Sequence, residues 1–183
     1  MKKAMMALGL FLILASGAFS QDIKLGIGVF GGLNIPIVQQ DQAMGSAFGV
    51  RARLAIKPIF VIEPNLILGK WGKPGKVDGY DLGIDGSKVT SYGIDLVLGG
   101  APGVTGFKPL FFAGAGIYSI KNDDTGYDES KLGFDGGLGF MIGAAPSLDL
   151  DIRGILMIAP QEEGSKKATI ITGGLTYYLG AVK

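Results

Sequence analysis

The feature that most constrains the fold of this chain is a two-residue alternation of polar and apolar side chains. In the stretch LDLDIRGILM, which begins at Leu148, two aspartates and an arginine alternate with leucine and isoleucine. Successive side chains of a β-strand point to opposite faces, so this segment is predicted to be a strand with one charged face and one apolar face. A sheet built from such strands turns its apolar face either into a soluble core or toward lipid.

The same alternation recurs in eight segments. The predicted strands cover residues 23–35, 48–57, 60–69, 91–99, 109–119, 131–142, 148–157 and 168–179. The connections between them are mostly long and short in turn, which is typical of an up-and-down membrane barrel with short turns at one end and longer loops at the other. We therefore predict an all-β fold, an eight-stranded antiparallel up-and-down transmembrane β-barrel. Pro64 lies inside the third strand, so we expect a β-bulge there or a later start of that strand.

The N-terminal residues have the pattern of a secretory signal peptide. Two lysines precede an apolar run from Ala4 to Ala15, and small residues at positions 18 and 20 fit a cleavage site before Gln21. This run is shorter than the roughly 20 residues of a membrane-spanning helix, and a retained signal anchor usually needs a longer one. We predict a cleaved signal peptide over 1–20 and one membrane β-barrel domain over 21–183.

The composition excludes several classes of function. The chain contains no cysteine and no histidine, which removes disulfides, a lipid-modified cysteine, a histidine base, a thiolate nucleophile and the common zinc-ligand sets. Without Lys2 and Lys3, 15 of the 17 basic residues remain against 16 acidic ones, so the net charge of about −1 predicts no nucleic-acid partner. We expect a protein that is not an enzyme and that binds no cofactor or metal.

The free-energy cost of placing charged side chains in lipid decides which face of the strands meets the membrane. Nine charged residues share the mixed face of the predicted strands: Lys24, Arg51, Arg53, Glu63, Asp95, Asp135, Asp149, Asp151 and Arg153. A basic residue at the bilayer midplane costs about 2–4 kcal/mol, whereas charges enclosed by eight strands can form ion pairs. The sequence therefore predicts an interior charge network of these nine residues, with the aliphatic side chains facing lipid. For Asp149 and Asp151 we favour structural ion pairs over acid–base work.

Aromatic residues on the apolar face gather at two levels. If the first strand rises from the periplasm, the outer girdle consists of Phe48, Tyr92 and Phe134, and the inner girdle of Phe60, Phe111, Phe140 and Tyr177. Aromatic belts of this kind are typical of membrane barrels, because their rings prefer the interface between lipid and water.

The last predicted strand carries the most specific motif. In TGGLTYYL, residues 172–179, Thr172, Gly174, Tyr177 and Leu179 form a pattern that resembles the C-terminal insertion signal of bacterial outer-membrane barrels. The stretch KPLFFAGAGIY, residues 108–118, also resembles a strand common in that family. The mature chain thus resembles the small eight-stranded outer-membrane β-barrel family, the type of outer-membrane proteins A and X. The resemblance implies a cell outer membrane of the Gram-negative type as location, with outer-membrane lipid and, during biogenesis, the assembly machinery as partners.

Several readings of function stay open at this point. The leading one is a structural barrel whose outer loops meet an extracellular partner, and the aromatic residues Trp71, Tyr80 and Tyr127 are candidate contacts on those loops. The alternative is a narrow porin-like pore for ions or small solutes. A soluble ligand carrier and a lipid-modifying enzyme are further alternatives. The acidic stretch 122–130 is predicted to be a solvated loop, although a divalent cation or cation-bridged headgroups are alternatives.

One motif is rejected. The string GIGVFG, residues 26–31, satisfies the dinucleotide-binding pattern Gly-x-Gly-x-x-Gly. That chemistry needs a helix N-terminus directly afterwards, and here the two-residue alternation continues to Pro36, which denies a helix. We interpret these glycines as relief of crowding inside a narrow barrel.

Overall fold

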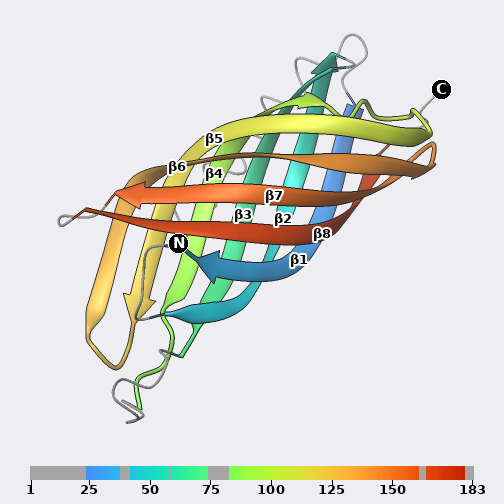
Figure 1. The fold of residues 1–183 in the computed structure, drawn as a ribbon. Coiled ribbons are helices and arrows are strands. Elements are labelled where there is room, and N and C mark those ends of the chain that lie inside the picture. Colours follow the sequence, from blue (N-terminus) through green and yellow to red (C-terminus); the bar gives the residue numbers. More distant parts are fainter. Residues whose placement is uncertain (1–23, 38–41, 58, 74–82, 161–163, 180–183) are drawn as a thin grey trace.

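The computed structural model is a closed barrel of eight antiparallel strands (Figure 1). It describes residues 24–37, 42–57, 59–73, 83–160 and 164–179, so the predicted signal peptide lies outside the described residues. The strands are β1 (Lys24–Pro36), β2 (Ala43–Lys57), β3 (Phe60–Gly72), β4 (Lys88–Gly99), β5 (Gly106–Asn122), β6 (Tyr127–Ala145), β7 (Leu148–Pro160) and β8 (Ser165–Leu179). The predicted all-β barrel with eight strands is confirmed.

Each strand pairs with its neighbour in the chain, and β1 pairs with β8 to close the barrel. This closing seam runs from the pair of Leu25 with Leu179 to the pair of Pro36 with Ala168. We call the end with the connections 37–42, 73–87, 123–126 and 161–164 the loop rim. The opposite end, with the connections at 58–59, 100–105 and 146–147, is the turn rim.

The sequence alternation separates an inner from an outer face. On β7 the inward Asp149, Asp151 and Arg153 are buried, whereas the outward Leu150 and Ile152 are about half exposed, at 43% and 50%. The same division holds on the other strands, where most of the exposed large side chains are aliphatic or aromatic. The distribution of residues is therefore the reverse of that in a soluble protein, because the exterior is apolar and the charged side chains lie inside.

The strands extend further at the loop rim than the alternation predicts. β2 begins at Ala43, and β4 begins at Lys88. The predicted loop 122–130 is reduced to a turn over 123–126, because β6 already begins at Tyr127. Beyond the apolar band the outward face carries polar residues such as Lys70 and Lys88, while the inward face carries apolar ones such as Trp71. The apolar outward face that signals a strand therefore ends there, while the hydrogen-bonded ladder continues. The prediction of these strand ends and of a long acidic loop was wrong for that reason.

Pro64 is accommodated without the predicted bulge. The pair of Arg51 with Asn65 and the pair of Leu54 with Ile62 keep one register across it. On the other side, Pro64 itself pairs with Ile94 in an uninterrupted ladder. Proline lacks one N–H donor but its fixed φ fits an extended strand, and the buried faces of the flanking residues hold the register.

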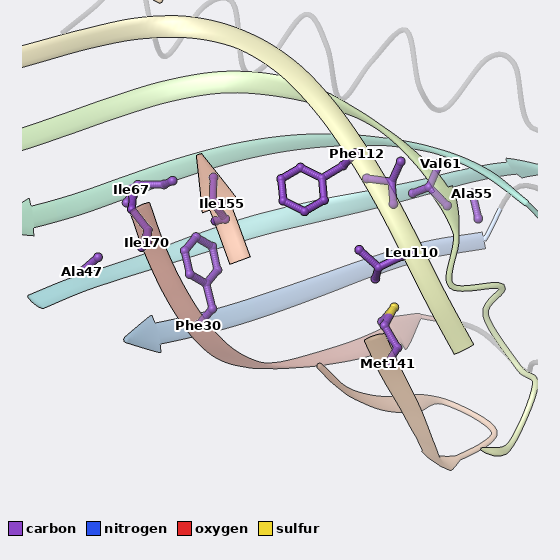
Figure 2. Packing of buried hydrophobic residues seen from close by; sticks show 11 residues of the cluster. Phe30, Ala47, Ala55, Val61, Ile67, Leu110, Phe112, Met141, Ile155 and Ile170 are labelled. Atoms are coloured by element: carbon purple, nitrogen blue, oxygen red, sulfur yellow. The ribbon is translucent and has the colours of Figure 1, made fainter. Parts of the chain in front are cut away.

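Two apolar clusters fill the interior. The first consists of Phe30, Ala47, Ala55, Val61, Ile67, Val97, Leu110, Phe112, Met141, Ile155 and Ile170. Figure 2 shows these side chains projecting from the strands into the enclosed space. The second lies nearer the loop rim and consists of Trp71, Val89, Tyr118, Ile120, Met157, Ala159 and Ala168, with Tyr127 packed against it. Eight strands leave an interior of a width that side chains can fill.

Candidate functional site

Three arginines surround one glutamate in the middle of the barrel. Glu63 accepts hydrogen bonds from Arg153 Nη1 at 2.5 Å and Nη2 at 3.2 Å, and it lies 3.3 Å from Arg53 Nε and 3.7 Å from Arg51 Nη1. Asp151 completes the group, with Arg51 at 2.6 Å and Arg153 Nε at 3.0 Å. All five side chains are buried. We call them the central ion cluster, which ties β2, β3 and β7 together across the interior.

Apolar side chains lie on both sides of the central ion cluster. On β2 the two arginines stand between Ala47 and Ala55, and on β3 the glutamate stands between Val61 and Ile67. The guanidinium of Arg51 lies 4.8 Å from the ring centre of Phe30, where a cation–π contact forms. The ionic groups are therefore enclosed rather than lining a continuous polar channel wall.

A second ionic group lies nearer the turn rim. Lys108 Nζ donates to Asp149 at 2.6 Å and to the carbonyl of Ala101 at 3.0 Å, and Tyr178 donates to the same aspartate at 3.0 Å. These contacts, with a bond from Arg53 to the carbonyl of Gly100 at 3.4 Å, hold the connection 100–105 against the barrel. Sequence reasoning missed Lys108, although its two-residue spacing from the buried Leu110 places it on the inward face.

A third group contains the two remaining aspartates. Tyr118 donates a short hydrogen bond to Asp135, and the buried Asp95 lies in the same group. Among the described residues, Oδ1 of each aspartate has no hydrogen-bond donor. Eight of the nine predicted charges thus lie in three groups of contacts rather than in one network. Lys24 is half-buried at the start of β1, and it joins none of the ion pairs found between described residues.

The seven predicted girdle residues all stand on the outward face. Phe48, Tyr92 and Phe134 are exposed on the halves of their strands nearer the loop rim. The other four occupy the half nearer the turn rim, where Phe140 stacks on the ring of Phe107 at 5.3 Å. Their role as interfacial anchors stays a prediction.

The predicted insertion signal forms most of β8. Thr172 points inward, and Tyr177 and Leu179 point outward. A Cβ at Gly174 would collide with the guanidinium of Arg51, so this position needs glycine for packing of the central ion cluster. The reading of these residues by an assembly machinery stays a prediction.

Trp71 was predicted to lie on an outer loop where a partner could reach it. The structure instead buries this side chain. It is 1% exposed in the second apolar cluster, and its indole N–H donates to Asn34 Oδ1 at 2.9 Å. Because β3 continues to Gly72, the alternation carries this side chain inward. Tyr127 is half-buried beneath Lys166, and Tyr80 lies outside the described residues.

The connections of the loop rim are tied to one another. Ser87 N–H donates to the side chain of Gln42 at 2.9 Å, and Asp85 N–H donates to Asp124 at 2.6 Å. Asn122 donates to the carbonyl of Asp85 at 2.8 Å. The described part of the connection 73–87 is therefore held against the β1–β2 and β5–β6 connections.

Exposed ion pairs also lie at the loop rim. Hydrogen bonds from Lys73 and Lys70 hold the pKa of Asp85 below its usual range. Lys88 and then Lys121 act on Asp123 in the same way and lower its pKa. Both aspartates are therefore ionised at neutral pH and bind the neighbouring ammonium groups.

A closed barrel with an apolar exterior and an ionic interior defines a membrane-embedded β-barrel. No helix long and apolar enough to span a membrane occurs in the part of the chain that the structure describes. Over residues 6–178 the sequence matches the family described as outer membrane protein beta-barrel domain, and the chain belongs to that family. Its location is the outer membrane of a Gram-negative-type envelope.

Solved structures share this fold at low sequence identity. Neisserial surface protein A is 14% identical with a TM-score of 0.65, over 84% of this chain and 96% of that one. The N-terminal barrel of Pseudomonas aeruginosa OprF is 16% identical with a TM-score of 0.55, over 85% and 97%. Ail of Yersinia pestis, in a bilayer nanodisc, is 16% identical with a TM-score of 0.54, over 86% and 100%. A search of curated proteins found no match.

Proposed function

We propose that the protein is a closed, non-enzymatic barrel that strengthens the outer membrane and presents its loop rim to partners outside the cell. The observation that carries this proposal is the filled interior. Apolar side chains lie on both sides of the central ion cluster, and the second apolar cluster fills the end nearer the loop rim. A wall of this kind supplies mechanical continuity and a display surface rather than a path for solutes.

The chemistry of the interior supports a role without catalysis. Asp149 is bound by Lys108 and Tyr178, and Asp151 by two arginines, so neither carboxylate is available for acid–base work. The chain offers no histidine or cysteine as a base or nucleophile. Both carboxylates serve as ion-pair partners and hydrogen-bond acceptors.

Conductance of the purified barrel tests closure. In a planar bilayer we expect no stable single-channel steps, because the interior is packed with side chains. Arg51→Ala serves as the second measurement, since it removes one cation from the central ion cluster. Stable steps in the wild type that change size in this variant would contradict the closed barrel and support the narrow pore.

Display of the loop rim is supported by the length of its connections and by the names of two structural neighbours. One is called a surface protein and another an attachment invasion locus protein. These similarities concern the fold, so a role in surface contact is our proposal for this chain. The orientation that it requires is a loop rim outside the cell and a turn rim in the periplasm.

Single cysteines test this orientation, because the natural chain has none. Thr125→Cys places a thiol on an exposed turn of the loop rim, and Thr105→Cys places a matched thiol on the turn rim. A membrane-impermeant maleimide added to intact cells is expected to label Thr125→Cys and to spare Thr105→Cys. The reverse pattern would overturn the proposed orientation and the display function with it.

A further inference from the structure

Two aspartates meet over a glycine inside the barrel. The strand register pairs Asp95 on β4 with Gly114 on β5, and Gly114 in turn with Asp135 on β6. A Cβ at position 114 would collide with Oδ1 of Asp95, so this carboxyl group lies over the backbone of the glycine. The glycine thus provides the space in which side chains from β4 and β6 come together. We call Asp95 and Asp135 the aspartate pair.

The carboxyl groups of the aspartate pair are short of hydrogen-bond donors. Asp95 is 6% exposed, and its carboxyl group lies within hydrogen-bond reach of that of Asp135. Tyr118, four residues along β5 from the glycine, donates to Oδ2 of Asp135. Among the described residues, Oδ1 of each aspartate has no donor. A buried acceptor without a donor costs free energy, so the pair as two carboxylates is incomplete.

The charged groups around the aspartate pair do not neutralise it. Glu63 on β3 pairs directly with Asp95 and brings a third carboxylate to the same side of the interior. Arg153 on β7 attracts Asp95 electrostatically, but its guanidinium hydrogen bonds go to Glu63 and to a second carboxylate. The residue that pairs with Asp135 on β7 is Met157, which carries no charge.

The charge of the central ion cluster indicates how many protons the pair holds. The cluster contains three arginines and two carboxylates, and therefore has one positive charge in excess. An aspartate pair with one negative charge balances this excess. With two negative charges, the middle of the barrel would keep an uncompensated charge away from water, which is costly.

The contact between the two carboxyl groups needs the same single proton. An ionised carboxylate only accepts hydrogen bonds, so two of them bind each other only when one is protonated. Two carboxylates that share a buried site also repel, which favours the retention of one proton. We propose that the aspartate pair is a proton-binding site that holds one proton between its two carboxyl groups at neutral pH. Because Asp135 already accepts from Tyr118, the proton resides on Asp95, which donates to Asp135.

This proton links β4 to β6 across β5 and makes the stability of the barrel depend on pH. Above about pH 5 both aspartates are ionised in the unfolded chain, so the folded barrel binds one proton more. Stability therefore falls as the pH rises, by about tenfold per pH unit in the unfolding equilibrium constant, until the pair loses its proton. The inference is independent of the proposed function, because it needs neither an orientation of the barrel nor a partner.

Infrared spectroscopy tests the proton directly. A protonated carboxyl group has a C=O stretching band separate from the bands of ionised carboxylates, and a detergent without ester groups leaves this region clear. At neutral pH we expect the band in the wild type and its loss in Asp95→Asn and in Asp135→Asn, because a single remaining carboxylate needs no proton. Tyr118→Phe should keep the band, since the phenol is a donor to the pair and not the bound proton.

Asp128→Asn removes an exposed carboxylate at the loop rim, and it is the matched control that should also keep the band. A folded wild type without the band, or a band that survives in either single variant of the pair, overturns the proposal. Heat-modifiable gel migration of every barrel confirms that the spectra compare folded protein.

The pH dependence of unfolding is the second measurement. The amide of Asp95→Asn donates a hydrogen bond to Asp135 in place of the proton and keeps the shape of the side chain. We expect its unfolding equilibrium constant at neutral pH to differ from that of the wild type by less than about fivefold, the net value of one hydrogen bond. Between about pH 6 and pH 8 its pH dependence should be smaller by about tenfold per pH unit. Equal pH dependence in both proteins overturns the proposal.

Discussion

The variant Glu63→Gln is expected to lose about 3–5 kcal/mol of unfolding free energy, because breaking a buried ion pair leaves uncompensated charge. Glu63 is the carboxylate that contacts all three arginines of the central ion cluster. Glutamine keeps the shape of the side chain and removes only its charge. Asp151, which contacts Arg51 and Arg153 but not Arg53, is then the remaining carboxylate of the buried cluster. Denaturant titration of the barrel in phospholipid vesicles measures the loss.

An exposed carboxylate provides the control for this prediction. Asp128→Asn removes a charge that lies 3.8 Å from Lys121 at the loop rim, and we expect a change below about 1 kcal/mol. If Glu63→Gln and Asp128→Asn have similar stability, the central ion cluster does not hold the strands together. The closed interior would then depend on the apolar clusters alone.

The variant Trp71→Ala is expected to lose about 3–5 kcal/mol, the usual cost of emptying a buried aromatic site. Trp71 fills the second apolar cluster near the loop rim, and its indole satisfies Asn34 Oδ1. The substitution therefore leaves both a cavity and an unpaired amide oxygen. Since Trp71 is the only tryptophan of the chain, circular dichroism or gel migration has to follow unfolding in place of fluorescence.

Two comparisons define what this second result means. Trp71→Phe retains most of the packing and removes the hydrogen bond, so its loss should be smaller than that of alanine. Phe48→Ala truncates an aromatic side chain on the outward face, where no interior cavity forms, and should cost less than Trp71→Ala. If Phe48→Ala loses as much unfolding free energy as Trp71→Ala, the burial of Trp71 inside the barrel contributes no special stability.

The sequence alone predicts the parts of this fold that depend on the two-residue period. Because the alternation is strict in segments such as 148–157, it places Asp149, Asp151 and Arg153 on the buried face and Leu150 on the other. The same reasoning correctly predicted eight strands and their antiparallel order. These properties are local, and each strand carries the information for its own two faces.

Ion-pair partners were beyond the reach of sequence reasoning. Arg51 and Asp151 are 100 positions apart, and their meeting depends on how side chains cross the enclosed space between β2 and β7. The alternation says which residues point inward but not which of them touch. For this reason one network was predicted where the structure has three groups, and Lys108 was left out.

The ends of the strands at the loop rim were the second feature that the sequence did not predict correctly. The apolar face is the signal for a strand, and it ends where the strand leaves the hydrocarbon. Backbone pairing continues beyond that point, so Trp71 and Tyr127 were assigned to loops although both lie in strands. Loop length was overestimated wherever a strand extends past the lipid.

The seam between β1 and β8 has a consequence for biogenesis. It joins residues 25–36 with residues 168–179, so the first strand has no partner on that side until the last strand has been synthesised. An open sheet cannot rest in hydrocarbon, because its free N–H and C=O groups find no water there. Translation must therefore be nearly complete before insertion can finish, and a chain that stops before β8 is expected to remain in the periplasm as a substrate for chaperones and proteases.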